Sequence, residues 1–313
     1  MKRLAQISAA IRKHPVRWGL GAGLCILLIL VIIAATNPMA CFRWGATRYL
    51  NLYGIERKKL KAGSFRISYL EGGAENAETV VLLHGFGGDG LTAWLRTLPL
   101  LQKHYHVIAP DLLCGSPKKI NITNYSATRE FQLVMALLRE KKIDKAHFVG
   151  LSVGGWIALM TASVQPGMVD RLVLISTAGV ETDMTELMEV AFSETSSPAK
   201  QVDLFFFHKP PFAEAAFGDH SPEGRLLRNK IKLVAQVMME RGPKMDNVLD
   251  DIVHPTLILW GRDDRVFPVE TAEYIHDRMP NSKLRIFDEC GHAVVWDRGN
   301  SMNAAILEFL GAD

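Results

Sequence analysis

The sequence predicts an α/β protein in which helices flank a mostly parallel sheet of eight strands. A helical cap is inserted between two strands of the sheet, and a transmembrane helix precedes the whole α/β domain. Three observations predict this architecture. Short apolar runs alternate with segments of helical spacing from residue 56 onward. About 75 residues without this alternation separate Ser176 from Thr256, and an uncharged run of 25 residues extends from Trp18 to Phe42.

Composition and charge exclude several classes of protein. The chain has 313 residues, and its 48% apolar content excludes a disordered protein. Residues 1–61 carry 11 basic side chains and one acidic side chain, whereas residues 62–313 carry 25 basic and 32 acidic ones. An acidic body argues against a nucleic-acid partner, because phosphate contacts need Lys and Arg. The four cysteines form no CxxC pair, which argues against a zinc site.

The N-terminal segment predicts a membrane anchor. Residues 24–33 are continuously apolar, and about 20 apolar residues span a bilayer as a helix. We therefore expect a basic lead at 1–17 and a transmembrane helix at 18–38. A cleaved signal peptide is the alternative, but the lead is long and the apolar run exceeds the usual length. Five basic residues before the run predict a single-pass membrane protein with a cytoplasmic N-terminus.

A short amphipathic helix is expected next, within a juxtamembrane segment at 39–55. Ala46, Tyr49, Leu50 and Tyr53 follow the spacing i, i+3, i+4, i+7. Such a helix lies on the membrane surface or packs against the body, and the residues leave both alternatives open.

The body, residues 56–313, alternates strands and helices. Strands are predicted at 56–61, 65–70, 79–83, 106–110, 146–149, 172–176, 256–260 and 283–287. Helices are predicted near 127–138 and at 153–164, 269–279 and 302–310. Several strands are almost wholly apolar, as in parallel sheets that are buried on both faces.

The interruption at about 180–250 predicts the helical cap, because a structureless loop of this length is rare. It is rich in phenylalanine and methionine. Phe205, Phe206, Phe207 and Phe212 are therefore candidate substrate-binding residues, although most such side chains serve only to pack the cap.

A candidate nucleophile lies in the run Gly150-Leu151-Ser152-Val153-Gly154. This run follows a predicted buried strand and opens a predicted helix. A serine at such a sharp turn adopts strained backbone angles, so small neighbours two residues away on either side avoid a clash. The placement indicates a nucleophilic serine rather than an ordinary glycine-rich turn.

A serine hydroxyl needs a base, and the base needs a carboxylate. His292 follows the last predicted strand, and Asp263 and Asp264 follow the strand before it. Carboxyl ends of parallel strands meet at one edge of the sheet, so we expect these side chains to converge with Ser152. The order serine, acid, histidine is that of the α/β-hydrolases.

The oxyanion of the tetrahedral intermediate needs two backbone N–H donors. We expect one from Val153, directly after the nucleophile, and one from Phe86 in the glycine-rich loop His84–Gly88. A dinucleotide site is the alternative interpretation of this loop, but the GxGxxG spacing is absent.

The chain resembles the lipase and esterase branch of the α/β-hydrolase superfamily over residues 56–311. It is most similar to membrane-bound monoacylglycerol lipases and cold-adapted bacterial lipases. The motifs that carry the resemblance are HGFGG with Trp94, Asp111-Leu112-Leu113, GLSVGG, Lys209-Pro210-Pro211, WGRDD and ECGHAVV. The resemblance implies that Asp264 is the acid, and it adds Trp94 and Val294 as candidate substrate-binding residues. Asp263 is expected to pair with Arg262 or Arg265. The loop after Asp111 departs from the family pattern, because it lacks a glycine.

Together these features predict a membrane-anchored serine hydrolase of lipid esters, most similar to a monoacylglycerol lipase. Ser152, Asp264 and His292 are its expected catalytic residues, and no metal or cofactor is implied. Two alternatives remain: a hydrolase of small esters or of carbon–carbon bonds in aromatic-ring-cleavage products, and a non-catalytic membrane-binding module.

Overall fold

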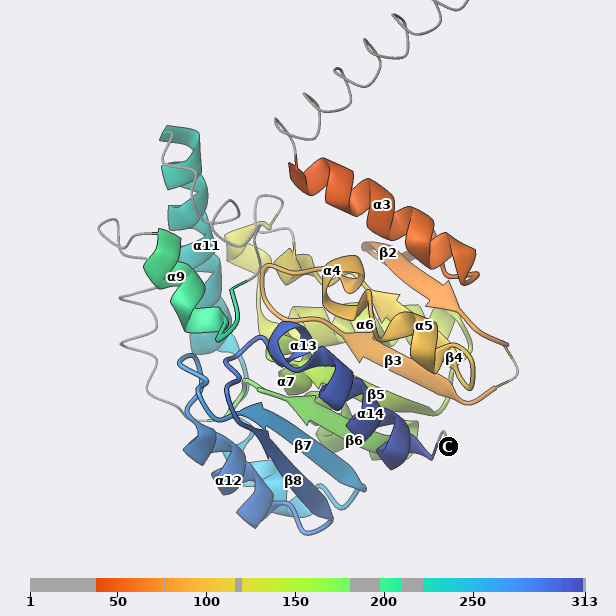
Figure 1. Ribbon diagram of the computed structural model, residues 1–313. Helices are drawn as coiled ribbons and strands as arrows, with labels where there is room; N and C mark the ends of the chain where they lie inside the picture. The colour runs from red at the N-terminus through yellow and green to blue at the C-terminus, as the bar shows by residue number, and fades with distance from the viewer. Residues whose placement is uncertain (1–37, 76, 116–119, 181–197, 210–221, 312–313) are drawn as a thin grey trace, which may run out of the picture. The chain divides into compact units, whose positions relative to one another are not determined.

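One sheet organises the part of the chain that the computed structural model describes, which is residues 38–75, 77–115, 120–180, 198–209 and 222–311. Its eight strands follow the order β1-β2-β4-β3-β5-β6-β7-β8 (Figure 1). They are β1 (Glu56–Ala62), β2 (Phe65–Gly72), β3 (Thr79–Leu83), β4 (His106–Pro110), β5 (Ala146–Leu151), β6 (Val169–Ile175), β7 (Thr256–Gly261) and β8 (Ser282–Phe287). Strand β2 runs opposite to the other seven strands and is therefore antiparallel to its neighbours, β1 and β4. The predicted mostly parallel sheet of eight strands is confirmed.

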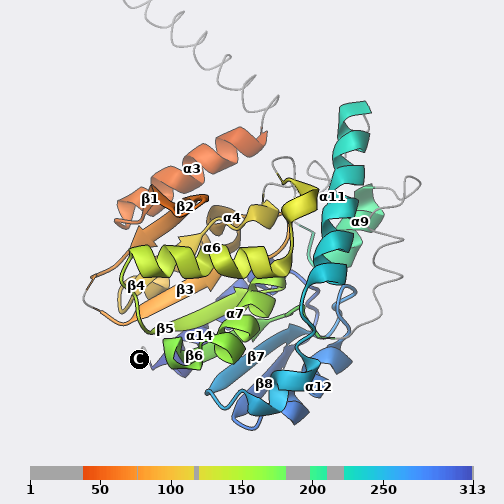
Figure 2. The same cartoon turned by 180° about the vertical axis from the view of Figure 1, so that it is seen from behind.

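Helices flank the sheet on both faces. They are α4 (Gly90–Trp94), α5 (Leu98–Leu101), α6 (Ala127–Glu140), α7 (Val153–Val164), α12 (Val269–Arg278), α13 (Val294–Asp297) and α14 (Gly299–Leu310). Short 3₁₀ helices are η1 (Leu113–Gly115), η3 (Ile122–Asn124), η4 (Pro166–Met168) and η5 (Asp246–Asp251). Helices α5 and α14 cover the face seen in Figure 1, and α6 and α7 cover the face seen from behind in Figure 2.

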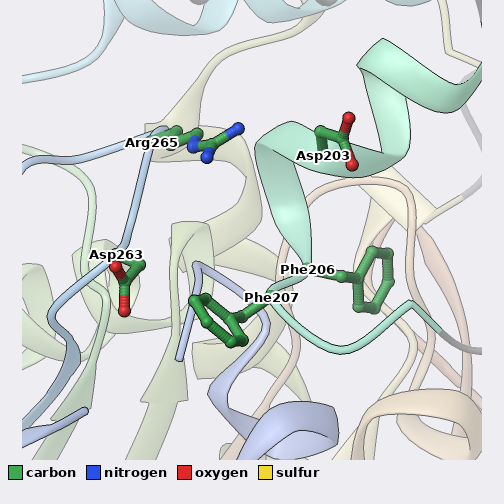
Figure 3. Close-up of a pocket in the computed structure, with 5 residues that line it drawn as sticks. All are labelled: Asp203, Phe206, Phe207, Asp263 and Arg265. Carbon is green, nitrogen blue, oxygen red and sulfur yellow. The ribbon is translucent and has the colours of Figure 1, made fainter. Parts of the chain in front are cut away.

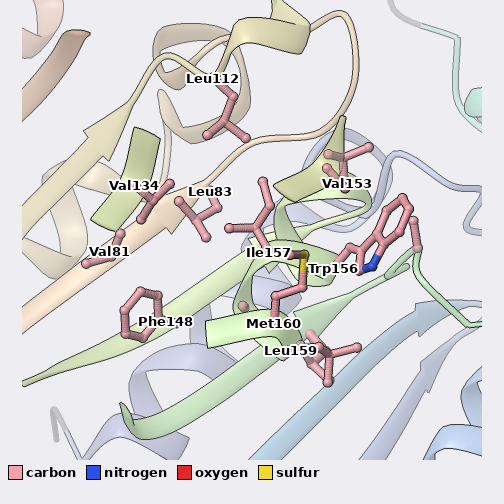
Figure 4. Packing of buried hydrophobic residues seen from close by; sticks show 14 of the residues in the cluster. Val81, Leu83, Leu112, Val134, Phe148, Val153, Trp156, Ile157, Leu159 and Met160 are labelled. Atoms are coloured by element: carbon pink, nitrogen blue, oxygen red, sulfur yellow. The ribbon is translucent and has the colours of Figure 1, made fainter. Parts of the chain in front are cut away.

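Helix α7 is the most deeply buried of these helices, because nearly all of its side chains are apolar. Its residues from Val153 to Ala162 are all buried. Trp156, Ile157 and Met160 pack in the same apolar cluster as Leu83 of β3 and Phe148 of β5 (Figure 4). A helix that is hydrophobic all round needs burial on every side. The helix start, where Ser152 lies, is therefore held by the core.

The chain divides into two compact units, Met1–Arg48 and Tyr49–Asp313. The predicted anchor at 18–38 lies outside the described residues except for Pro38, so the anchor and the cytoplasmic N-terminus stay predictions. Helix α3 (Pro38–Leu52) occupies the place of the predicted juxtamembrane helix. No helix within the described residues combines the length and the apolar character that crossing a bilayer requires.

The cap that the sequence predicts at about 180–250 falls in the segment between β6 and β7, and it stays a prediction. Its described parts include α9 (Pro198–Phe205) and α11 (Pro222–Arg241), as the helical prediction requires. Phe212 lies outside the described residues.

Candidate active site

Ser152 occupies a sharp turn between β5 and α7. Its backbone angles are φ 55° and ψ −116°, which are rare for a residue with a side chain. The Ser152 N–H donates a hydrogen bond to the Ile175 carbonyl of β6 at 2.8 Å, which secures the turn to the neighbouring strand. Backbone strain of this kind persists only where the surrounding structure enforces it, and it is found at functional sites.

The glycines beside Ser152 are required by close backbone contacts. A β-carbon at Gly150 would lie 2.4 Å from the Gly154 carbonyl carbon, and one at Gly154 would lie 2.1 Å from the Leu83 carbonyl oxygen. Both distances are far below van der Waals contact. The GxSxG pattern therefore corresponds to a tight strand-to-helix turn at the carboxyl edge of the sheet.

His292 and Asp264 form a buried pair. Nδ1 of His292 lies 2.9 Å from Oδ2 of Asp264. The other oxygen of Asp264 accepts the backbone N–H groups of Val266 at 2.8 Å and Phe267 at 2.9 Å. Because the carboxylate only accepts, Nδ1 carries the proton, and Nε2 of His292 is left as an acceptor.

The three side chains come from the carboxyl ends of three parallel strands. Ser152 follows β5, Asp264 follows β7 and His292 follows β8. Asp263, the competing acid, is exposed, and its carboxylate accepts the Cys290 N–H at 3.3 Å. The predicted Asp263–Arg262 pair is wrong: Arg262 binds Asp288 at 2.5 Å, because the chain turns after β8 and brings Asp288 to it.

The glycine-rich loop lies directly against the serine. A β-carbon at Gly85 would be 3.2 Å from the Ser152 Cβ. Among the described residues, neither the Phe86 N–H nor the Val153 N–H donates to a backbone carbonyl. Val153 is the first residue of α7, where N–H groups have no partner within the helix. Both N–H groups are thus available to a ligand oxygen.

His84 supports this loop, a role that sequence reasoning missed. Its buried side chain donates from Nδ1 to the Gly85 carbonyl at 2.7 Å and accepts the Leu112 N–H on Nε2 at 2.8 Å. Burial lowers the pKa of His84, so the ring stays neutral, as this pattern of one donor and one acceptor requires.

Glu130 supports the same loop from α6 and was also missed. Its fully buried carboxylate accepts the N–H groups of Leu113 at 2.8 Å and Cys114 at 2.7 Å, and the Tyr125 hydroxyl at 2.8 Å. The Cys114 carbonyl then accepts the Gly87 N–H at 3.2 Å. Burial raises the pKa of Glu130 to about 7 against these hydrogen bonds, which favour the ionised form. The sequence did carry a signal for this role, because Glu130 lies on the apolar face of the helix predicted near 127–138.

Ionisation of Glu130 should make the protein less stable as pH rises. Its pKa is higher in the folded chain than in the unfolded chain, so between the two values the native state binds more protons. Unfolding in urea should show wild type losing roughly 2 kcal/mol relative to Glu130→Gln between about pH 5 and about pH 8. Glu140→Gln, which changes an exposed glutamate of the same helix, is the matched control. Equal pH dependence in all three proteins would contradict this assignment.

The predicted substrate-binding residues that the structure describes divide into three groups. The ring of Phe205 lies edge-on to the His292 ring, with 6.1 Å between the ring centroids. The ring of Phe267, which sequence reasoning did not single out, also lies edge-on to His292, with 5.3 Å between the centroids. Phe206 and Phe207 line a small pocket of about 130 Å³. Its other lining residues are Asp203, Asp263 and Arg265 (Figure 3).

Trp94 and Val294 are wholly buried, Trp94 at the end of α4 and Val294 at the start of α13. Neither lines the pocket beside Phe206. Within the described residues, no group of three or more His, Cys, Asp and Glu side chains is arranged to hold a metal ion.

A family model described as the alpha/beta hydrolase family matches residues 80–305. The chain belongs to the alpha/beta hydrolase family. The match includes the turn at Ser152, Asp264 and His292, and the eight-stranded sheet agrees with it.

Named relatives of this alpha/beta hydrolase differ in their activities. The 2-hydroxy-6-oxo-2,4-heptadienoate hydrolase of Pseudomonas putida is 30% identical over 265 residues, which cover 80% of this chain and 95% of the relative. The crystal structure of a membrane phospholipase A, described as a bacterial virulence factor, has a TM-score of 0.76 and 26% identity. It covers 94% of this chain and 98% of its own. A serine hydrolase from the polyaromatic-hydrocarbon-degrading bacterium Cycloclasticus zankles has a TM-score of 0.67 and 26% identity, covering 83% and 99%.

Proposed function

We propose that this alpha/beta hydrolase is a serine hydrolase of lipid carboxylic esters, with a monoacylglycerol or similar acylglycerol as substrate. The observation that carries the proposal is the strained turn at Ser152 together with the buried Asp264–His292 pair. Both belong to the machinery of acyl transfer, and they come from separate strands of one sheet edge.

Each residue then has a defined role. Ser152 Oγ attacks the ester carbonyl carbon while its proton passes to Nε2 of His292, and Asp264 holds the imidazolium by Nδ1. The N–H groups of Phe86 and Val153 stabilise the oxyanion. His292 returns the proton to the departing alcohol oxygen, which leaves an acyl-enzyme. Water then attacks this ester by the same route and regenerates Ser152.

The surroundings of His292 favour an acyl chain in the substrate. Phe205 and Phe267 place apolar rings against the base, and Phe206 and Phe207, the next two residues after Phe205, line the small pocket. The membrane phospholipase A structure covers a larger share of this chain than the Cycloclasticus zankles hydrolase does. We further propose that residues 18–38 anchor the enzyme in a bilayer with residues 1–17 on the cytoplasmic side, so that the catalytic domain meets its lipid substrate at the membrane.

Hydrolysis of carbon–carbon bonds in ring-cleavage products is the second candidate, which the Pseudomonas putida relative favours. The substrate in that relative's name is a carboxylate. An anionic substrate is stabilised by positive charge around it, whereas the rings of Phe205 and Phe267, which lie against His292, are apolar. We therefore rank the ester reaction first.

The proposal is tested by measuring kcat/KM for a series of p-nitrophenyl esters from acetate to decanoate, each kept below its micelle concentration. Each buried methylene contributes roughly 0.8 kcal/mol, so kcat/KM should rise several-fold for each added pair of carbons. Phe206→Ala and Phe207→Ala should flatten the rise, whereas Tyr274→Ala, an exposed aromatic of α12, should leave it unchanged. The full-length protein is used, recovered from carbonate-washed membranes.

Four outcomes would contradict parts of this proposal. A flat series in wild type removes the argument for a lipid ester, and a kcat/KM for a ring-cleavage dienoate above that of every ester selects the second candidate. Failure to label with a fluorophosphonate supports the non-catalytic alternative. Release of intact full-length protein by the carbonate wash contradicts the anchor.

A further inference from the structure

Asp297, the last residue of α13, joins the cap to the loop that carries His292. Its Oδ2 accepts the Gly291 N–H at 2.8 Å and the Phe207 N–H at 2.9 Å. Its Oδ1 accepts the His208 N–H at 2.9 Å. One carboxylate therefore binds two chain segments that are more than eighty residues apart in sequence.

Two further contacts bring the same segments together. The Ala293 N–H donates to the Phe205 carbonyl at 2.7 Å, one residue beyond His292. A β-carbon at Gly291 would lie 3.1 Å from both the Phe205 carbonyl oxygen and the Phe207 nitrogen. The cap backbone thus lies directly on the loop before His292, and a β-carbon at Gly291 would push the cap backbone away by a few tenths of an ångström.

We propose that Asp297 is a positioning residue that couples the cap to the catalytic base. Through the Gly291 N–H it fixes the position of His292, and through the Phe207 N–H it fixes the position of the phenylalanines that we propose contact the acyl chain. The His292 loop and this part of the cap therefore move as one unit. The inference rests on the proposed function, because it assigns His292 the role of base.

The chemistry of the side chain explains why a carboxylate is needed. Three N–H groups converge on two oxygens that only accept. In Asp297→Asn one oxygen becomes an NH₂ group, which turns a donor toward at least one of these N–H groups. The contact between the cap and the His292 loop then opens while the size of the side chain is conserved.

The control for Asp297→Asn is Asp288→Asn. Asp288 lies just before the same loop, and its exposed carboxylate pairs with the Arg262 side chain. Hydrogen exchange should accelerate about tenfold or more in the peptides 205–209 and 289–293 together, but not in α14. On the acetate ester, where the cap contributes little, kcat should fall about ten- to hundredfold with KM within about twofold. Asp288→Asn should match wild type in both measurements.

The coupling is overturned if exchange rises in 205–209 alone while kcat on the acetate ester is unchanged, or if Asp297→Asn behaves as Asp288→Asn does. Should Asp297→Asn fail to fold, Gly291→Ala is measured instead and must show the same pair of effects. If wild type neither hydrolyses esters nor labels with a fluorophosphonate, the proposed function has failed, and the exchange measurement still decides whether Asp297 joins the two segments.

Discussion

Replacing Ser152 with alanine should lower kcat for ester hydrolysis by on the order of 10⁶, because the nucleophile, base and acid act as a unit. Adding His292→Ala to that variant should cost little more, since the base has no hydroxyl left to activate. The measurement is kcat with purified protein on an ester that wild type turns over readily.

Ser176→Ala is the matched control for this experiment. Ser176 directly follows the neighbouring strand β6 and also has a positive φ, and its buried hydroxyl has no hydrogen-bond partner among the described residues. It should retain most of the activity. Near-normal turnover by Ser152→Ala would remove Ser152 from the mechanism.

The second large effect is expected at the acid. Oδ1 of Asp264 accepts two backbone N–H groups, so the oxygen of an asparagine would stay there and its NH₂ group would face His292. Nδ1 of His292 would then have to accept, which moves the proton to Nε2, the atom that must take the proton of Ser152. Asp264→Asn should therefore lower kcat by about 10⁴ with the fold intact.

Asp263→Asn is the control, because Asp263 is adjacent in sequence, yet its carboxylate accepts the Cys290 N–H and does not bind His292. Its effect on kcat should be far smaller than that of Asp264→Asn. A larger effect at Asp263 than at Asp264 would show that the wrong carboxylate has been assigned to His292.

The sequence by itself determined the elements that local patterns encode. The alternation of strand-length segments with helical spacing predicted all eight strands, of which β1 (Glu56–Ala62) is mostly charged, and helical spacing predicted α7 at its observed bounds. GxSxG predicted the strained turn at Ser152, because only glycines tolerate the close contacts at positions 150 and 154. The preference for Asp264 over Asp263 came from the family resemblance, since adjacent carboxylates have the same local pattern.

Only the tertiary structure decided which backbone groups the supporting carboxylates hold. Glu130 binds N–H groups 16 and 17 residues away, and Asp297 binds Phe207 90 residues away. The pairing of Arg262 with Asp288 and the burial of Trp94 were equally invisible in the sequence. The physical reason is that backbone N–H groups are the same in every residue, so a side chain that binds them leaves no matching residue type to find. Local periodicity therefore places the candidate catalytic side chains at the sheet edge, whereas the side chains that support them depend on how distant segments pack.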